Sequence, residues 1–401
     1  MNEANDVFIV DGVRSPRGRG NSKGALHNLK PVELGRQAVV ALMRRTPMPP
    51  ERVEDLLLGC VTQRGEQGAN IAKTVASLAG LPATTSAATL NRFCASGLSA
   101  ANLMAAAIGA GQCEVGVAGG LEMTSRVPMF SDQGPWFADP EVARATRFVH
   151  MGVSADLVAS LAGVSRVEAD AYAAETHQRA AEAMTKRRHH HVSAVDSSGD
   201  VLLDQDELIR ADTTERALAK LPALFGSEHG VALAREQTEA RNLALRAVHH
   251  AGNSPKVADG ASVLMLASRT ACERYAIRPV ARICGAIHAS SDPVRMLDGN
   301  GAAIARLTKQ LGWKYQDIDR FEVNESFAGV MVALQRELGV GRRKFNPDGG
   351  AIARGHALGA TGSMLVCQAL DGLVARGGGR AVISICGGAG VIATTAIETL
   401  P

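Results

Sequence analysis

Asn91-Arg92-Phe93-Cys94-Ala95-Ser96-Gly97 is the stretch around which the rest of the chain is organised. Residues 84–90 before it are small or β-branched, which is typical of a buried strand, and residues 98–110 after it are rich in Ala and Leu, which predicts a helix. Cys94 is therefore expected where a strand turns into a helix. The unpaired amides and the dipole of a helix N-terminus favour a thiolate, so the position predicts a lowered pKa for this thiol.

The same stretch is compatible with two roles for Cys94. Ser96 and Gly97 keep the turn compact, and their backbone N–H groups could face an oxygen anion. A free cysteine is also among the most often buried side chains, where it acts as a small hydrophobic residue. From this stretch alone, both a nucleophile and a core residue stay open.

Composition bounds the class of protein. A chain of 401 residues can form two or three domains, and a net charge of +3 without an aromatic-plus-basic pattern gives no argument for nucleic acid. The seven cysteines include no C-x-x-C pair, which indicates neither a zinc knuckle nor a disulfide framework. Because a strand-like run begins at residue 7 and no apolar run is long enough to span a membrane, we expect a cytoplasmic protein without a targeting segment.

Strands and helices are predicted to alternate along the chain, which indicates a parallel sheet covered by helices. Strands are expected over residues 7–10, 53–61, 115–120, 262–266, 280–287, 320–323 and 381–385. Helices are expected over residues 29–45, 69–79, 302–311, 326–338 and 361–375. The order of elements after residue 271 repeats the order over residues 7–120, which predicts an internal duplication of the fold.

Residues 121–250 have a different texture, with more charges, more polar loops and an amphipathic helix over residues 168–185. We interpret this part as an inserted domain that covers one face of the sheet. The run Arg187-Arg188-His189-His190-His191 suggests a metal site, but no second ligand cluster accompanies it. A solvated helix end is therefore the preferred interpretation of this run.

Three further stretches in the second half carry reactive side chains, and each has a structural alternative. Asn324-Glu325-Ser326-Phe327 follows a strand, so its polar side chains either cap the next helix or face a site. His356, in the glycine-rich run 349–359, is a structural histidine or the general base of a nearby cysteine. Cys386-Gly387-Gly388 ends a strand, so the thiol is a core residue or an acid and base, and the flexible backbone could form an oxyanion hole.

Taken together, these four stretches resemble the thiolase family over nearly the whole chain. The family has a nucleophilic cysteine in a C-x-S-G turn, an N-E-x-F box, a G-H box in a glycine-rich loop and C-x-G near the C-terminus, all present here in that order. Further segments that resemble the family are Val10-Asp11-Gly12-Val13-Arg14-Ser15-Pro16, His150-Met151-Gly152, residues 175–180, Ala251-Gly252-Asn253 and Asp259-Gly260-Ala261.

The chain departs from the family pattern at several positions. Ala357 follows the histidine where the family usually has proline, and the approach to that loop reads Asn346-Pro347-Asp348-Gly349. Pro255 stands where a serine that contacts coenzyme A is common, with Ser254 beside it. Residues 225–249 are longer than the usual connection and have a helical pattern. These changes affect the expected contacts with the acyl and pantetheine groups, and they leave the expected catalytic residues in place.

The resemblance implies an α/β fold: a duplicated, five-layered α-β-α-β-α core with an inserted loop domain. Its halves would be residues 1–120 with 251–270, and residues 271–401, with the loop domain over 121–250. It implies a homodimer or homotetramer, with residues 84–90 as the candidate contact. It also implies coenzyme A as a substrate and no cofactor.

The activity implied is thiolytic cleavage of a 3-ketoacyl-CoA in fatty acid metabolism, or the reverse Claisen condensation. Cys94 would become acylated, and His356 would take its proton and help to hold the thioester oxygen. Cys386 would exchange a proton with the acetyl-CoA enolate, and Asn324 would position a water against that enolate. The amides of Cys94 and Gly388 would hold the oxyanion. Coenzyme A contacts are expected from Met151, Ser254, Arg210 and Lys220.

Two alternatives remain at this stage, a close enzyme rival and a protein of another class. A ketoacyl synthase acting on acyl carrier protein shares the fold and the cysteine but uses two histidines, and Asn324 stands where the second is expected. A non-catalytic, thiolase-like lipid carrier or complex subunit would be favoured by loss of Cys94 or His356, and both are present. A zinc site made by Cys94, His356 and Cys386 lacks local ligand spacing.

Overall fold

The computed structural model describes residues 6–186, 189–225 and 245–400. Its main sheet follows the strand order β10-β11-β12-β9-β1-β8-β5-β3-β4, with β2 (Gly18–Arg19) paired beside β8. Two halves meet where β1 and β9 pair antiparallel over three residue pairs. The strands of the first half are β1 (Val7–Arg14), β3 (Asp55–Gly59), β4 (Ser86–Leu90), β5 (Val115–Met123) and β8 (Ala258–Ser268). Those of the second are β9 (Ala281–Ser290), β10 (Arg320–Val323), β11 (Arg380–Cys386) and β12 (Val391–Thr399).

The two halves have the same topology, which agrees with the expected duplication. In the first, β5 pairs parallel with β3 and antiparallel with β8, which in turn pairs antiparallel with β1. In the second, β11 pairs parallel with β10 and antiparallel with β12, which pairs antiparallel with β9. A single bridge between Phe321 and Phe345 takes the place that β4 has in the first half.

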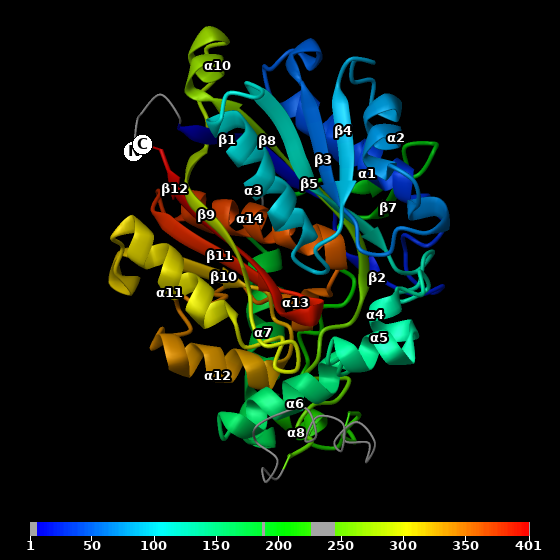
Figure 1. The fold of residues 1–401 in the computed structure, drawn as a ribbon, viewed down its shortest axis with the longest axis vertical. Coiled ribbons are helices and arrows are strands. Elements are labelled where there is room, and N and C mark those ends of the chain that lie inside the picture. Colours follow the sequence, from blue (N-terminus) through cyan, green and yellow to red (C-terminus); the bar gives the residue numbers. More distant parts are fainter. Residues whose placement is uncertain (1–5, 187–188, 226–244, 401) are drawn as a thin grey trace.

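Helices form three layers around the two half-sheets, as Figure 1 shows. Helices α1 (Pro31–Arg45) and α2 (Ile71–Leu78) cover the first half-sheet on the outside, and α11 (Asn300–Leu311) packs on β9 and β12. Outside α11 lies α12 (Ala328–Leu338), which also packs on the loop-region helices. The central layer contains α3 (Ser96–Gly109) and α14 (Leu358–Ala375), which pack against each other and against strands of both halves. The five-layered core is therefore present.

Two glycines let α3 and α14 approach each other closely at their N-terminal ends. A Cβ atom on Gly97 would lie 2.5 Å from the Gly359 carbonyl oxygen, and one on Gly362 would lie 2.4 Å from the Leu98 nitrogen. Distances this short are not tolerated, so these positions require glycine. The loops that precede the two helices are thereby brought to one place.

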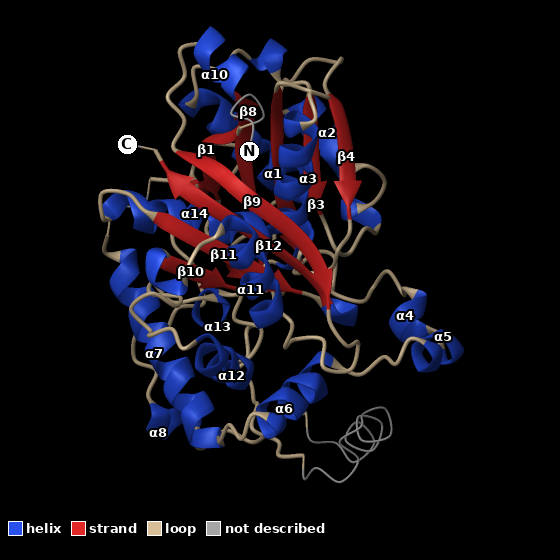
Figure 2. Ribbon diagram, turned by 60° about the vertical axis from the view of Figure 1, so that its left-hand side comes forward, coloured by secondary structure: helices blue, strands red, loops and turns tan. Residues whose placement is uncertain are grey.

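Residues 121–250 supply helices that lie beyond one end of the sheets (Figures 1 and 2). Their α7 begins with a capping box made by Ser165 and Glu168. The elements of this part are α4 (Pro135–Ala138), α5 (Pro140–Ala145), α6 (Met151–Leu161), α7 (Arg166–Met184), β6 (Ala194–Val195), β7 (Val201–Leu203) and α8 (Glu215–Leu218). Short helices elsewhere are α10 (Arg269–Arg274) and α13 (Ala351–Arg354). The division of the chain into domains stays a prediction.

Most predicted elements are present with ends shifted by a few residues, and four expectations need correction. The sheet is mixed and not parallel, because β1, β8, β9 and β12 pair antiparallel with their neighbours. The strand expected over 84–90 is an edge strand, β4 (Figure 2). It is not buried, because its side chains are partly exposed. His190 is not solvated, because its ring is 2% exposed and its Nδ1 lies 2.7 Å from a carboxylate oxygen of Asp371. The strand expected over 7–10 is too short, because β1 continues to Arg14. The helix expected within 225–249 falls largely on residues 226–244, outside the described residues.

Within the described ranges one helix, α14, is long and apolar enough to cross a membrane, but 78% of it is buried inside the fold. Its place between the half-sheets accounts for its apolar composition. The expected cytoplasmic location stays a prediction.

Candidate active site

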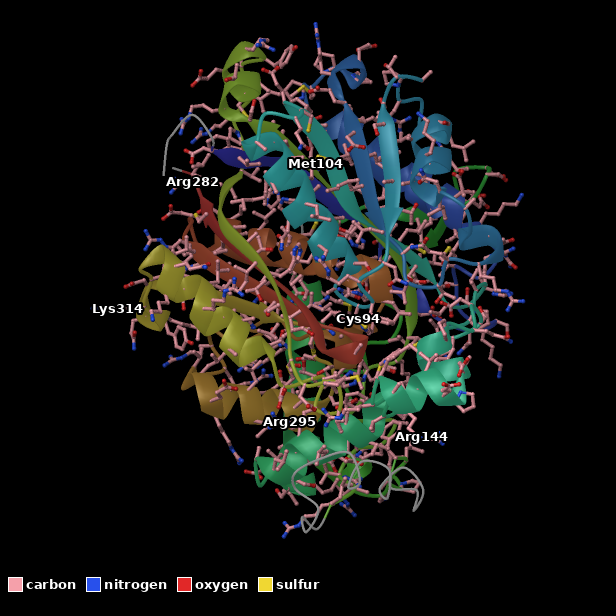
Figure 3. The ribbon with its side chains drawn as sticks, viewed as in Figure 1. Cys94, Met104, Arg144, Arg282, Arg295 and Lys314 are labelled. Atoms are coloured by element: carbon pink, nitrogen blue, oxygen red, sulfur yellow. The ribbon has the colours of Figure 1, made fainter. Side chains whose placement is uncertain are left out.

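Cys94 lies in a tight turn between β4 and α3. Phe93 just before it has a positive φ of 46°, a conformation that is unfavourable for a bulky side chain. Two hydrogen bonds hold the turn: the Phe93 amide donates to Asn91 Oδ1 over 2.8 Å, and the Arg92 amide donates to Ser96 Oγ over 2.8 Å. Figure 3 shows Cys94 near the middle of the molecule, between the sheets and the loop-region helices.

The loop after β11 passes directly against this turn. A Cβ atom on Gly387 would lie 3.0 Å from the Cys94 nitrogen, so the two backbones are nearly in contact. Ala389 in the same loop has a positive φ of 56°. Cys386 ends the strand that leads into this loop and is 1% exposed.

His356 is fixed at the start of α14 by bonds on both sides. Its backbone amide donates to the Lys256 carbonyl over 2.8 Å, just before β8. Its ring Nδ1 lies 2.8 Å from Thr361 Oγ1. The ring is 8% exposed, so it faces a confined space.

A single cavity of about 320 Å3 brings the predicted residues together. It is lined by all five predicted catalytic residues and by two of the predicted substrate contacts: Cys94, His356, Cys386, Asn324, Gly388, Met151 and Ser254. The five predicted catalytic residues come from three separate loops and from the segment that follows β10. Segments more than 200 residues apart in the sequence thus meet at one site.

The expected lowering of the Cys94 pKa is wrong. Burial raises the pKa of this thiol to about 12, and the nearby Cys386 acts in the same direction. The Cys94 and Gly388 amides favour the thiolate but do not overcome the loss of hydration. Burial also raises the pKa of the Cys386 thiol to about 11, against the opposing effect of the nearby Asn300 and Ser326 side chains.

The histidine is neutral for the same physical reason. Burial, aided by the positive charge of Arg17, lowers the pKa of His356 to about 3. At neutral pH the cavity therefore holds two thiols and an uncharged imidazole, without a preformed thiolate and imidazolium pair. A neutral imidazole can accept a proton as the thiol attacks.

The oxyanion donors expected from Cys94 and Gly388 stay a prediction. Both amides interact with the Cys94 sulfur, so they lie beside the atom that would react. The Ser96 amide is already used, because it donates to the Phe93 carbonyl over 3.0 Å. Ser96 therefore stabilises the turn and is not an oxyanion donor.

Asn324 and Glu325 have separate roles, and neither caps the next helix. The Oδ1 atom of Asn324 is buried without a partner in the structure and belongs to a residue that lines the cavity. Glu325 points elsewhere, accepting hydrogen bonds from Tyr172 and Thr176 of α7 and from the Ile352 amide. It connects α7 with the loop that carries His356.

The predicted coenzyme A contacts divide into two groups. Met151 begins α6, and Ser254 has a buried Oγ atom without a hydrogen-bond partner among the described residues. Arg210 and Lys220 do not line the cavity; both are exposed, and Arg210 borders a separate surface pocket that includes His177. Their role toward the nucleotide stays a prediction.

Sequence reasoning missed the aromatic lining and Thr361. The aromatic residues Phe130, Trp136, Phe137 and Phe148 occur within one short segment of a chain with only 3% aromatic residues. That local concentration was a usable signal. Among the described residues, no group of three or more His, Cys, Asp or Glu side chains is arranged to hold a metal ion.

Comparisons with known proteins agree over the full chain. The family models "Thiolase, N-terminal domain" and "Thiolase, C-terminal domain" match residues 7–270 and 277–399. A 3-ketoacyl-CoA thiolase of Marinobacter nauticus is 34% identical over 396 residues, covering 96% of each chain. A beta-ketoadipyl-CoA thiolase of Pseudomonas putida is 34% identical over 416 residues, covering 98% of this chain and 99% of the relative. The crystal structure of the Bacillus anthracis acetyl-CoA acetyltransferase superimposes with a TM-score of 0.87 at 30% identity, covering all of both chains.

Proposed function

The chain belongs to the thiolase family, and from that premise we propose which residues carry each step and which thioesters it takes. Its reaction is thiolytic cleavage of a 3-ketoacyl-CoA to acyl-CoA and acetyl-CoA, or the reverse condensation. Within this family we assign it as an acyltransferase for 3-ketoacyl-CoA substrates. Coenzyme A serves as a substrate, and we assign no cofactor.

The observation that carries this assignment is the meeting of Cys94, His356 and Cys386 in one cavity. The Cys94 sulfur attacks the keto carbon of the substrate, and His356 accepts the thiol proton. The oxyanion is held by the Cys94 and Gly388 amides. Its collapse breaks the bond between the α and β carbons, leaving an acyl group on Cys94 and the enolate of acetyl-CoA.

The second half of the cycle uses the other residues. Cys386 donates a proton to the α carbon of the enolate, while His356 and a water on Asn324 Oδ1 stabilise its oxygen. Coenzyme A then attacks the acyl-cysteine, and its thiol proton reprotonates Cys386. Acyl-CoA leaves as the Cys94 thiolate regains its proton from His356. Two charge developments on two thioesters need two sets of donors, and we assign the Cys94 and Gly388 amides as one set and His356 with the Asn324-bound water as the other.

The ketoacyl synthase alternative is not favoured, because the matched family models are those of thiolases. A non-catalytic carrier is tested by the same experiment as the activity. The purified protein is mixed with acetoacetyl-CoA or a longer 3-ketoacyl-CoA and free coenzyme A, and products are separated by chromatography. We expect two molecules of acetyl-CoA from each acetoacetyl-CoA, and the shortened acyl-CoA and acetyl-CoA in equal amounts from the longer substrate. Binding without turnover of any substrate would overturn the proposal.

Two further parts of the assignment concern contacts outside the cavity. We propose that Arg210 and Lys220 meet the phosphates of coenzyme A, since both are exposed cations in the loop region. Their replacement by Ala is expected to raise KM for coenzyme A in a salt-sensitive way, without changing acylation by a short pantetheine thioester. We also propose a homodimer or a dimer of dimers, in which the open edge of β4 meets a second copy.

A further inference from the structure

Aromatic side chains are concentrated in the active-site cavity. The whole sequence contains nine Phe, three Tyr and two Trp. Six of these aromatic residues line the one cavity that contains Cys94: Phe93, Phe130, Trp136, Phe137, Phe225 and Phe327. All six are only partly buried, so each ring leaves surface open for contact. Aromatic residues are therefore concentrated in this cavity and rare in the rest of the chain.

The rings form two walls from different parts of the chain. In the first, Phe93 lies 4.9 Å from Trp136 at 51°, and Trp136 lies 4.8 Å from Phe148 at 87°, between ring centroids. In the second, Phe225 lies 5.7 Å from Phe327 at 90° and stacks at 5.5 Å on His150. Tilted and edge-to-face pairs hold these rings in defined orientations.

The first wall lies beside the reacting sulfur. A Cβ atom on Gly388 would be 2.9 Å from Cη2 of Trp136, so the indole covers the loop whose amide interacts with Cys94. Phe93 is the residue directly before the nucleophile. An acyl group bound to Cys94 would therefore meet Trp136 and Phe93 within its first few atoms.

The described lining offers no cation for a charged acyl chain. It includes Asp132 but neither Lys nor Arg. Burial lowers the pKa values of His150 and His356, so both rings are neutral at pH 7. A carboxylate at the end of the acyl chain would lose hydration here without gaining an ion pair.

We propose that the acyl group transferred by this site carries an uncharged aromatic ring, held against the first wall beside Cys94, while the second wall adjoins Met151, the contact assigned to coenzyme A. The proposal rests on the thiolase activity assigned above and adds the substrate class to it. An aryl ring gains favourable ring-to-ring contacts beyond the burial of apolar area, whereas an alkyl chain of similar size gains the area alone.

The test compares thiolysis of four substrates by the full-length protein. These are 3-keto-5-phenylpentanoyl-CoA, 3-ketooctanoyl-CoA, 3-ketoadipyl-CoA and acetoacetyl-CoA. We expect kcat/KM for the phenyl substrate to exceed that for the octanoyl substrate by at least about threefold, the effect of one good aromatic pair. An equal or higher value for any of the other three would overturn this inference while leaving the thiolase activity intact. If none of the four substrates is cleaved, the thiolase activity itself is overturned.

The two tryptophans provide a matched pair of variants. Trp136→Leu is expected to lower the ratio of phenyl to octanoyl kcat/KM by at least about threefold. Trp313 lies outside the cavity, with its ring 4.8 Å from the Arg380 guanidinium, so Trp313→Leu should leave the ratio unchanged. An unchanged ratio in Trp136→Leu would show that the first wall does not select the ring, and would overturn the proposal.

Discussion

The ring nitrogen Nδ1 of His356 lies 2.8 Å from Oγ1 of Thr361, one turn into α14. A donor role for Nδ1 leaves Nε2 as the acceptor that a general base requires. The backbone of His356 is held by Lys256 at the same time, so ring and main chain are both fixed. Thr361 therefore acts as a positioning residue for the base.

Removing this hydroxyl should slow the reaction without altering the fold. We expect Thr361→Val to lower kcat by about fivefold, which corresponds to the loss of one hydrogen bond worth about 1 kcal/mol. Thr361→Ser keeps the hydroxyl and should restore most of the rate. A serine variant as slow as the valine variant would show that packing and not the hydrogen bond is responsible.

The pH dependence of Cys94 alkylation follows from the raised pKa of its thiol. Burial places that pKa at about 12, so the thiol is protonated at neutral pH and its thiolate fraction grows with pH. Below the pKa this fraction rises about tenfold per pH unit. The rate of iodoacetamide labelling, followed by mass spectrometry of the Cys94 peptide, should rise from pH 7 to pH 9 without a plateau. Fast labelling that is independent of pH would indicate a thiolate and imidazolium pair instead.

The nucleophile itself was predictable from sequence, but its electrostatics were not. Cys94 stands at a strand-to-helix turn, and such local patterns are visible in the sequence. Its pKa depends on burial by loops 260 to 290 residues further on, so the local helix argument predicted the wrong direction. The burial of His190 was not predictable for the same reason, because its partner Asp371 lies far along the chain in α14.

The exposure of β4 and the aromatic lining could not be predicted for a related reason. The composition of residues 84–90 predicts a strand, but only the sheet order shows that β4 is at the edge. Trp136 lies in a four-residue helix within a loop region that has no periodic pattern. Side chains in such segments are positioned by tertiary contacts, as the packing of Trp136 against Gly388 illustrates.

The choice between the two cavity thiols can be tested by trapping the acyl-enzyme. Cys94→Ala should abolish acyl transfer with an unchanged circular dichroism spectrum, because Cys94 is the thiol beside the two amides that we propose to hold the oxyanion. Brief exposure of the unsubstituted protein to an acyl-CoA, then digestion and mass spectrometry, should show the acyl group on the Cys94 peptide. An adduct on the Cys386 peptide would reverse the two roles.

Ser254 is the side chain best placed to hydrogen-bond coenzyme A, because its neighbour Pro255 has no hydroxyl or amide hydrogen to donate. The Oγ atom of Ser254 is buried at the cavity without a partner in the structure, so a ligand oxygen or nitrogen would satisfy it. Ser254→Ala should weaken transition-state binding by about 1 kcal/mol, the usual effect of one hydrogen bond. The change should raise KM more than it lowers kcat, since the contact is remote from the reacting carbon. A lowered kcat with unchanged KM would place Ser254 in the chemical step.

The open edge of β4 gives the last prediction, which concerns assembly. This strand pairs with β3 on one side and is the end of the sheet on the other, and Ala88 at its middle is exposed. Unpaired edge strands with small side chains readily pair with a second copy, and a lysine on the edge is the usual means of preventing it. We expect the unsubstituted protein to be a dimer or larger by light scattering at micromolar concentration, and Ala88→Lys to shift it toward monomer. Ala305→Lys, on the exposed face of α11, is the matched control and should leave the assembly unchanged. A monomeric unsubstituted protein, or equal dissociation in both variants, would exclude β4 as the contact.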